Sequence, residues 1–174
     1  AVPAVLGLPP MIQVIERPSP EDRAQVTRFL LACPAQSGAC PEHDPRWLDV
    51  LREGLGHRTF MLLARKTELE SEHPPEKTPA NQPPNSPGPI RGYLPLALVA
   101  SRLFGRFLVS LPYLNRAGLA ADGPDAADEL VRHAVRMAQD HDARYLELRQ
   151  GFPAVDHELL GTRRADKVRM VLPL

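Results

Sequence analysis

The stretch that most constrains the fold is a pair of apolar runs separated by a short turn. The first run covers Ile90–Ser101, the second covers Arg106–Pro112, and the turn between them contains Gly105. Aliphatic and aromatic runs on either side of a glycine-containing turn are typical of two antiparallel strands. An amphipathic segment and another short apolar run follow. The sequence therefore predicts a hairpin, a helix and a further strand within one α/β domain.

The other elements are indicated by periodicity and by capping residues. Strands are predicted at Met11–Glu16, Thr59–Ala64, Tyr145–Leu148 and Val168–Leu172, and helices from Ser19 or Pro20 to Pro34, from Asp44 to Glu53 and from Pro124 to His141. Thr59–Ala64 is a continuous apolar run, which indicates a strand covered on both faces. Pro95 has no backbone N–H and is expected at a bulge or at an unpaired edge position.

The composition changes abruptly between residues 67 and 89. Thr67–Pro89 contains seven prolines and several charges but no Phe, Tyr or Trp. Such a segment buries too little apolar surface to offset the entropy lost on ordering, so it is predicted to be a disordered loop. Because strands are predicted on both sides, it is interpreted as an insertion in a hairpin, and residues 1–174 are expected to form a single domain.

The balance of charge and hydropathy argues against several classes of protein. The chain has 21 basic and 21 acidic side chains, so its overall charge gives no electrostatic footprint for a nucleic-acid duplex or an anionic membrane. It lacks a run of about 18 apolar residues, so no membrane span is expected. Two cysteines without a secretory signal indicate a reducing, cytoplasmic location.

Two groups of residues have the side chains, but not the spacing, of known sites. Cys33, Cys40 and His43, with His57 further on, are zinc-ligand types, yet six residues separate the two cysteines. Two reduced thiols are therefore expected, with a disulfide or a metal site as alternatives. The run Asp140-His141-Asp142 could orient a general base, but its place at the end of a predicted helix favours capping.

No catalytic residue, metal ligand or cofactor site can be named from a motif in this sequence. The candidates for substrate binding are Tyr113, Asn115 and Arg116. They lie at or just after the carboxyl end of a predicted strand, where α/β sheets place their ligand crevices. Trp47 lies on the apolar stripe of a predicted helix, and it is expected to belong to the core and not to a ligand platform.

The sequence resembles the FemAB-like N-acyltransferases, which have a GNAT-like fold, and within them the branch associated with exosortase (PEP-CTERM) and exopolysaccharide systems. The similar segments are His43–Trp47 with Gly56-His57, Arg91–Leu96, Ser101–Gly105 and Asp166–Leu174. The resemblance implies a GNAT-like mixed sheet with helices on both faces. It also implies transfer of an acyl or aminoacyl group from a donor to an amine acceptor in cell-envelope or exopolysaccharide biogenesis.

The chain departs from this family at the loop after the second hairpin strand. The family usually has Asn-Tyr-Gly-Gly, whereas this chain has Asn115-Arg116-Ala117-Gly118. The GNAT coenzyme A motif, Arg/Gln-x-x-Gly-x-Gly/Ala, is also imperfect, because the first glycine comes one position early and the second is missing. A coenzyme A site is therefore not expected at this loop, and a connection that only turns the chain is favoured.

The resemblance further implies that the sequence is incomplete relative to the family. It stops before the family's basic helix and its second GNAT-like domain, so the chain is expected to be the N-terminal part of a longer enzyme and inactive alone. Two alternatives remain open. One is a non-catalytic GNAT-like binding or structural module, and the other is an acetyl-CoA-dependent N-acetyltransferase.

Overall fold

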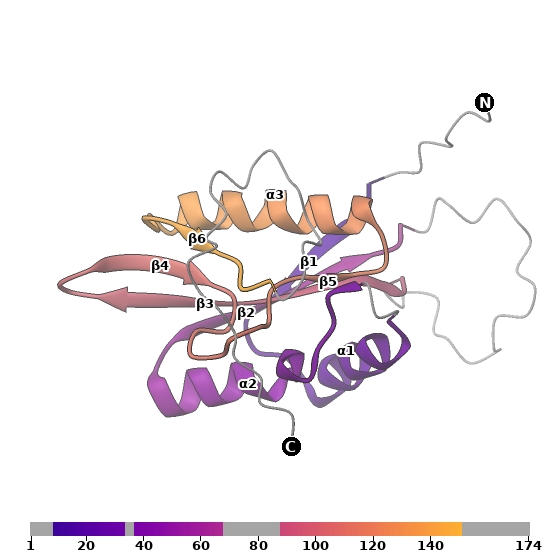
Figure 1. Cartoon of the computed structure of the whole chain (residues 1–174), viewed down its shortest axis with the longest axis horizontal. Helices are drawn as coiled ribbons and strands as arrows, with labels where there is room; N and C mark the ends of the chain where they lie inside the picture. Colours follow the sequence, from indigo (N-terminus) through magenta and orange to yellow (C-terminus); the bar gives the residue numbers. More distant parts are fainter. Residues whose placement is uncertain (1–8, 34–36, 68–87, 151–174) are drawn as a thin grey trace, which may run out of the picture.

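The computed structural model describes residues 9–33, 37–67 and 88–150, and Figure 1 shows them as three layers. The elements are β1 (Met11–Ile15), α1 (Pro20–Ala32), the 3-10 turn η2 (Pro41–His43), α2 (Arg46–Asp49), the π-helical turn η3 (Val50–Gly54), β2 (Arg58–Arg65), β3 (Ile90–Ser101), β4 (Gly105–Val109), β5 (Ala120–Ala121), α3 (Pro124–Asp140) and β6 (Leu146–Glu147). α3 covers one face of the sheet, while α1 and α2 cover the other. The predicted α/β class, a mixed sheet with helices on both faces, is confirmed.

The sheet has the order β1-β2-β3-β4-β6, and β5 pairs with β3. Neighbours from β1 to β4 are antiparallel, whereas β6 runs parallel to β4 after the crossover through α3. On one side, Pro95 pairs with Met61 of β2. Its other side faces neither β5, which pairs with Gly92 and Tyr93, nor β4, which pairs with residues 97–101. A residue without an N–H is tolerated at such an unpaired position, as predicted.

The two faces of β2 bury different residues, as its apolar run predicts. Phe60, Leu62 and Ala64 pack with the apolar side of α3. Met61 and Leu63 pack instead with Val26 of α1 and with Leu48 and Leu51 of the opposite layer. A strand at the centre of three layers needs apolar side chains on both faces, which removes the usual alternation.

The helix boundaries follow from local capping. Ser19 caps α1 in a reciprocal pair with Asp22, whose backbone N–H donates to the Ser19 hydroxyl at 3.1 Å and whose carboxylate accepts from the Ser19 N–H at 2.8 Å. Pro124 occupies the first turn of α3, and His141 is its C-cap. The capping interpretation of residues 140–142 is consistent with this position.

The hairpin that contains the proline-rich segment is formed by β2 and β3. Arg65 pairs with Ile90, and the Lys66 N–H donates to the Pro89 carbonyl at 3.0 Å, so the ends of the segment meet. The predicted disorder of Thr67–Pro89 falls almost wholly outside the described residues, as does the predicted strand Val168–Leu172. The second strand of the next hairpin was predicted to reach Pro112, which is wrong: β4 ends at Val109, because Leu111 takes a positive φ of 40°.

One strongly polar side chain is buried at the end of the sheet. Arg65 is 2% exposed, and its guanidinium donates to three neutral oxygens. These are Gln13 Oε1 on β1 at 2.7 Å, Gln25 Oε1 on α1 at 3.0 Å and the Gly88 carbonyl before β3 at 3.0 Å. Burial lowers the pKa of Arg65 from its ordinary value, which Asp22 partly opposes. Arg65 therefore joins three segments of the fold at one point.

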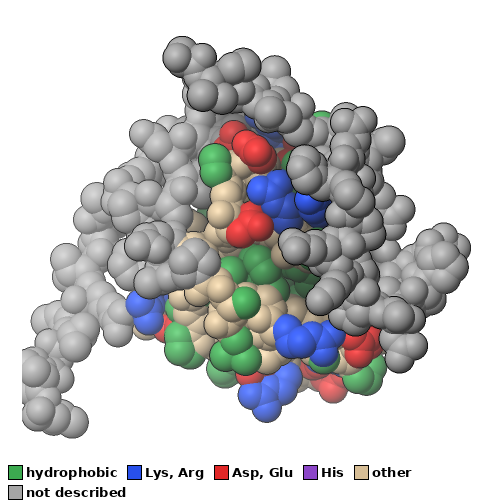
Figure 2. Space-filling view, turned by 90° about the vertical axis from the view of Figure 1, so that its right-hand side faces the viewer, with side chains coloured by type: hydrophobic (Ala, Val, Ile, Leu, Met, Phe, Trp, Pro, Cys, Tyr) green, Lys and Arg blue, Asp and Glu red, His purple; other side chains and the backbone are tan. Residues whose placement is uncertain are grey.

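On the face shown in Figure 2, positively and negatively charged side chains are interspersed. On the described part of that face, basic and acidic side chains lie next to one another rather than in a patch of one sign. Within residues 9–33, 37–67 and 88–150, no helix has both the length and the apolar character needed to cross a bilayer.

Candidate functional site

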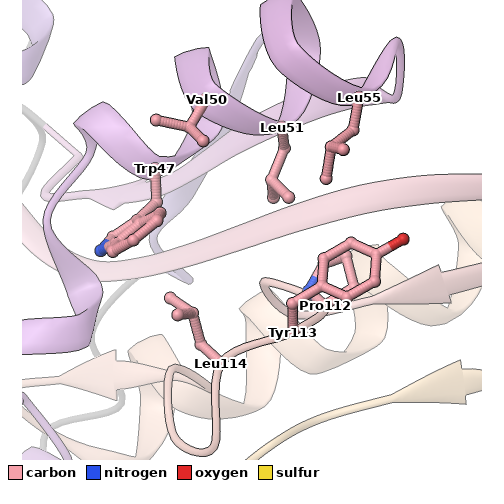
Figure 3. A pocket seen from close by; sticks show the side chains of 7 residues that line it. All are labelled: Trp47, Val50, Leu51, Leu55, Pro112, Tyr113 and Leu114. Atoms are coloured by element: carbon pink, nitrogen blue, oxygen red, sulfur yellow. The ribbon is translucent and has the colours of Figure 1, made fainter.

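A small apolar cavity opens between the α2–η3 segment and the loop that follows β4. It encloses about 120 Å³. Figure 3 shows one wall from the helical segment and the other from the loop, and the lining residues are Trp47, Val50, Leu51, Leu55, Pro112, Tyr113 and Leu114. A cavity of about 150 Å³ lined by apolar side chains accommodates benzene. This cavity is therefore suited to a short apolar group.

The helical wall is shaped by a change of helix type. The sequence predicts one helix from Asp44 to Glu53, but α2 gives way at Val50 to the π-helical turn η3. Asp49, at this junction, accepts hydrogen bonds from Arg23 of α1 at 2.9 Å and from Arg52 at 2.5 Å. π-Helical turns are rare and often occur at functional sites. The turn places Val50 and Leu55 partly in solvent at the cavity.

The prediction that Trp47 belongs to the core is wrong. Leu48 and Leu51 from the same apolar stripe are buried, but the Trp47 indole is 38% exposed and lines the cavity. The apolar stripe of this helical segment is wider than the part of it that packs on the sheet. Residues at the edge of the stripe, such as Trp47, therefore face the cavity. A residue at that edge can contact a ligand.

The opposite wall is held in an unusual backbone conformation. Leu111 and Tyr113 have φ values of 40° and 75°, in the left-handed region that side chains with a Cβ rarely adopt. Arg149, just after β6, fixes this loop: its guanidinium donates to the Leu114 carbonyl at 2.8 Å, and its backbone N–H donates to the Ser110 hydroxyl at 2.8 Å. Backbone strain that persists in this way is concentrated at functional sites.

A tyrosine–histidine pair lies beside the cavity, whose lining includes Tyr113 but not His57. The Tyr113 hydroxyl lies 3.1 Å from Nε2 of His57, and one donates to the other according to the imidazole tautomer. The rings are also stacked, with centroids 6.0 Å apart and an interplanar angle of 13°. Tyr113 is 67% exposed, so a bound molecule can reach its hydroxyl. Both groups can hold or pass a proton.

The three predicted substrate-binding residues are placed differently from one another. Tyr113 lines the cavity, whereas Asn115 is exposed and is not part of its lining. Arg116 points to a second cluster, where it forms an ion pair with Glu42 at 3.3 Å. Their role in substrate binding stays a prediction. Sequence reasoning missed His57 in this role, because nothing local indicates a partner 56 residues away.

The second cluster surrounds Cys40 and His43. The Cys40 Sγ lies 3.0 Å from His43 Nδ1, and His43 Nε2 lies 3.0 Å from the Gly118 carbonyl oxygen, which fixes Nε2 as the protonated nitrogen. Burial, followed by Glu42, raises the pKa of the Cys40 thiol to about 11. Cys40 is therefore a neutral thiol at neutral pH, and Cys33 is also free. In the described residues, no group of three His, Cys, Asp or Glu side chains is placed to hold a metal ion.

His43 should make the stability of the fold sensitive to acid. Its side chain is buried, and burial lowers its pKa below the ordinary value of 6.5. The unfolded chain thus binds a proton first as the pH falls, so the contribution of neutral His43 is present above about pH 6.5 and is lost below it. Below that pH, the free energy of unfolding falls by at most about 1.4 kcal/mol per pH unit because of this one group.

Denaturant unfolding of the wild type and of His43→Gln between neutral and mildly acidic pH measures this effect. Glutamine cannot titrate, and its Nε2 can still donate to the Gly118 carbonyl. The wild type should lose more stability than the variant as the pH falls. His133, whose pKa burial also lowers, is present in both proteins and cancels in the comparison. Parallel pH profiles would show that His43 does not titrate in this range.

Several backbone N–H groups between Arg116 and α3 already have partners within the protein. The Ala117 N–H donates to the Arg149 carbonyl at 3.1 Å, and the Leu119 N–H donates to Gln150 Oε1 at 2.5 Å. At the start of α3, Pro124 has no N–H and Asp125 adds a negative charge to the first turn. A helix N-terminus binds anions through free N–H groups and its dipole. Pro124 removes one donor and Asp125 repels an anion, so this helix start is a poorer phosphate site than one without them.

Comparison with known proteins gives a limited result. No family model matches the sequence, and no curated protein matches it. Among solved structures, a protein described as a probable acetyltransferase superposes with a TM-score of 0.49 at 18% identity, covering 94% of this chain and 97% of that one.

Proposed function

We propose that the chain is an acyl-group-binding domain of the N-acyltransferase type, which places a short apolar acyl or aminoacyl group in the cavity beside Tyr113 and His57. The observation that carries the proposal is an apolar cavity lined by Tyr113, whose hydroxyl is hydrogen-bonded to His57. An apolar pocket with a few converging polar groups is the usual form of a small-molecule site. The strained loop that presents Tyr113 supports the same location.

The chemistry assigned to the pair is a balanced transfer. An amine attacks the carbonyl carbon of an activated ester or thioester, so that a C–N bond forms and the C–O or C–S bond breaks. His57 takes the proton that the amine loses, and the Tyr113 hydroxyl gives a proton to the departing oxygen or sulfur. The hydrogen bond of 3.1 Å between them returns the proton from His57 to Tyr113. Holding donor and acceptor in attack geometry supplies much of the remaining rate.

The occupied backbone donors argue against an acetyl-CoA enzyme that holds its pyrophosphate at the α3 N-terminus. Because Ala117 and Leu119 already donate within the protein, a donor whose recognition rests on its acyl group fits better. We therefore expect coenzyme A alone, at millimolar concentration, to leave the melting temperature unchanged. Isovaleryl-pantetheine, which lacks the pyrophosphate, should raise it by about 5–10 °C at about a hundred times its Kd.

Product analysis separates this proposal from its rival. If isovaleryl-pantetheine stabilises the protein and amide forms with an amine acceptor in a mass spectrum, the transferase proposal is supported. Stabilisation without amide formation would favour a non-catalytic binding module, which the internally satisfied loop also favours. Stabilisation by coenzyme A alone would contradict the proposed mode of donor recognition.

The finer assignment rests on the similar sequence segments alone. We propose that the chain is the N-terminal part of a FemAB-like protein with a second GNAT-like domain, acting in the cytoplasm in cell-envelope or exopolysaccharide biogenesis. Two free thiols suit a reducing compartment. An immunoblot of the source lysate tests the assignment: a band near twice the mass of this chain supports it, and a band at its mass of 19.2 kDa contradicts it.

A further inference from the structure

The β3–β4 hairpin extends beyond the rest of the sheet. β2 begins at Arg58, which pairs with Leu98, so β3 continues past β2 toward its turn. β4 pairs with β6 at Leu108 and Val109, and nearer the turn the Arg144 N–H donates to the Arg106 carbonyl at 2.8 Å. Figure 1 shows the tip of this hairpin reaching past the helices of both outer layers. The turn therefore projects from the sheet, and only its base, at Gly105 and Arg106, contacts the segment around Arg144.

The tip presents apolar side chains to solvent. Leu103 is 85% exposed and Phe104 is 65% exposed, and they are adjacent at the turn. Behind them, Phe107 stacks on Tyr145 with ring centroids 4.7 Å apart, and Tyr145 is itself half exposed. A single exposed hydrophobic residue is ordinary, but neighbouring ones on a projection have a physical cost in water.

The turn is already hydrogen-bonded within itself. The Ser101 hydroxyl accepts from the N–H groups of Leu103 at 3.3 Å and of Phe104 at 3.2 Å. Gly105 completes the turn with a φ of 90°, and the Arg144 side chain lies directly against it. Because these two backbone donors have partners, the tip can enter a region with little water without leaving them unsatisfied.

The charges around the tip are mostly positive. Arg102, Arg106 and Arg144 are exposed there, and the carboxylate that pairs with them is Asp142, 3.6 Å from Arg106. Among the described residues at the tip, three positive charges and one negative charge leave an excess of two, which the zero net charge of the whole chain conceals. Guanidinium groups bind phosphate oxygens through paired hydrogen bonds.

From this arrangement we infer that the hairpin tip binds the surface of an anionic lipid bilayer, with Leu103 and Phe104 inserted among the lipids and the arginines on the headgroups. A convex tip of two side chains suits a deformable surface, whereas a stable protein interface buries roughly 800 Å² on each partner. Apolar insertion combined with attraction to anionic lipids is how proteins lie on membranes without spanning them. The inference is independent of the proposed function.

Sedimentation with phosphatidylcholine vesicles, with and without phosphatidylserine, tests the inference. The wild type should bind the vesicles that contain phosphatidylserine, and less so as salt is added. The double variant Leu103→Ser/Phe104→Ser should bind them at least about tenfold more weakly. Leu31→Ser is the matched control, because Leu31 is 83% exposed on α1, and it should bind like the wild type. In Phe104→Trp, the emission of the new indole should shift to the blue with vesicles.

Two results would overturn the inference. One is the absence of vesicle binding by the wild type, or equal binding by the wild type and the double variant. The other is self-association in sedimentation velocity that the double variant abolishes while vesicle binding is absent, which would assign the tip to a protein contact. The substitutions are at exposed positions, and equal melting temperatures would show that all variants are folded.

Discussion

Replacing Arg65 with methionine should lower the free energy of unfolding by about 3 kcal/mol or more. The guanidinium is 2% exposed and donates to Gln13, Gln25 and the Gly88 carbonyl. Methionine keeps much of the volume but leaves these acceptors without a donor. Since they belong to β1, α1 and the start of β3, their loss should loosen three segments together. Denaturant unfolding followed by circular dichroism measures the change.

Arg58→Met is the matched control on the same strand. Arg58 forms an ion pair with Glu16 at 2.5 Å, but its side chain is 51% exposed. Exposed ion pairs contribute little to stability, so the control should be much closer to the wild type. If Arg65→Met cost no more than Arg58→Met, the buried hydrogen bonds would only offset the desolvation of the guanidinium.

The partners of Arg65 provide a second check. Removing the donor alone leaves amide oxygens unsatisfied, whereas replacing both donor and acceptors with apolar groups can be nearly neutral. The triple variant Arg65→Met/Gln13→Met/Gln25→Met should therefore be more stable than Arg65→Met alone. If the triple variant instead lost as much stability as the three single variants added together, each side chain would stabilise the fold through its own packing.

Much of the fold could be predicted, because the elements that build the layers have strong local signals. The continuous apolar run before Arg65 indicates a strand covered on both faces, and the Ser19 cap marks the start of α1. β5, with two residues, was missed because so short a strand has no periodicity. The end of β4 was misplaced because the chain leaves the extended conformation at Leu111, where φ is 40°, and the hydrogen bonds of Arg149 to the flanking Ser110 and Leu114 are long-range contacts that no local pattern indicates.

The site was only partly predictable for the same reason. Tyr113 was selected because the predicted strand ended at Pro112; β4 ends at Val109, and Tyr113 lies in the loop that follows. Its partner His57 and the cavity wall depend on how η3 packs against the loop after β4, and the sequence between them contains no signal for that contact. The charge at the hairpin tip was also hidden, since net charge is an average over the whole chain and binding depends on local arrangement.

Tyr113→Phe should lower kcat for acyl transfer about a hundredfold while leaving KM within about twofold. The phenyl ring still lines the cavity, so binding of the apolar group is kept. The hydroxyl that gives a proton to the leaving group is lost. His57→Gln should have a similar effect, because it removes the group that takes the proton from the amine. Steady-state rates with isovaleryl-pantetheine and an amine acceptor measure both variants.

The double variant distinguishes a coupled pair from two separate contributions. If Tyr113 and His57 act through their shared hydrogen bond, losing both should cost little more than losing either one. Tyr145→Phe is the matched control, because Tyr145 is also exposed but stacks on Phe107, outside the cavity lining. It should retain full activity. A Tyr113→Phe variant as active as the wild type would remove the hydroxyl from the reaction and leave its ring as a wall of the cavity.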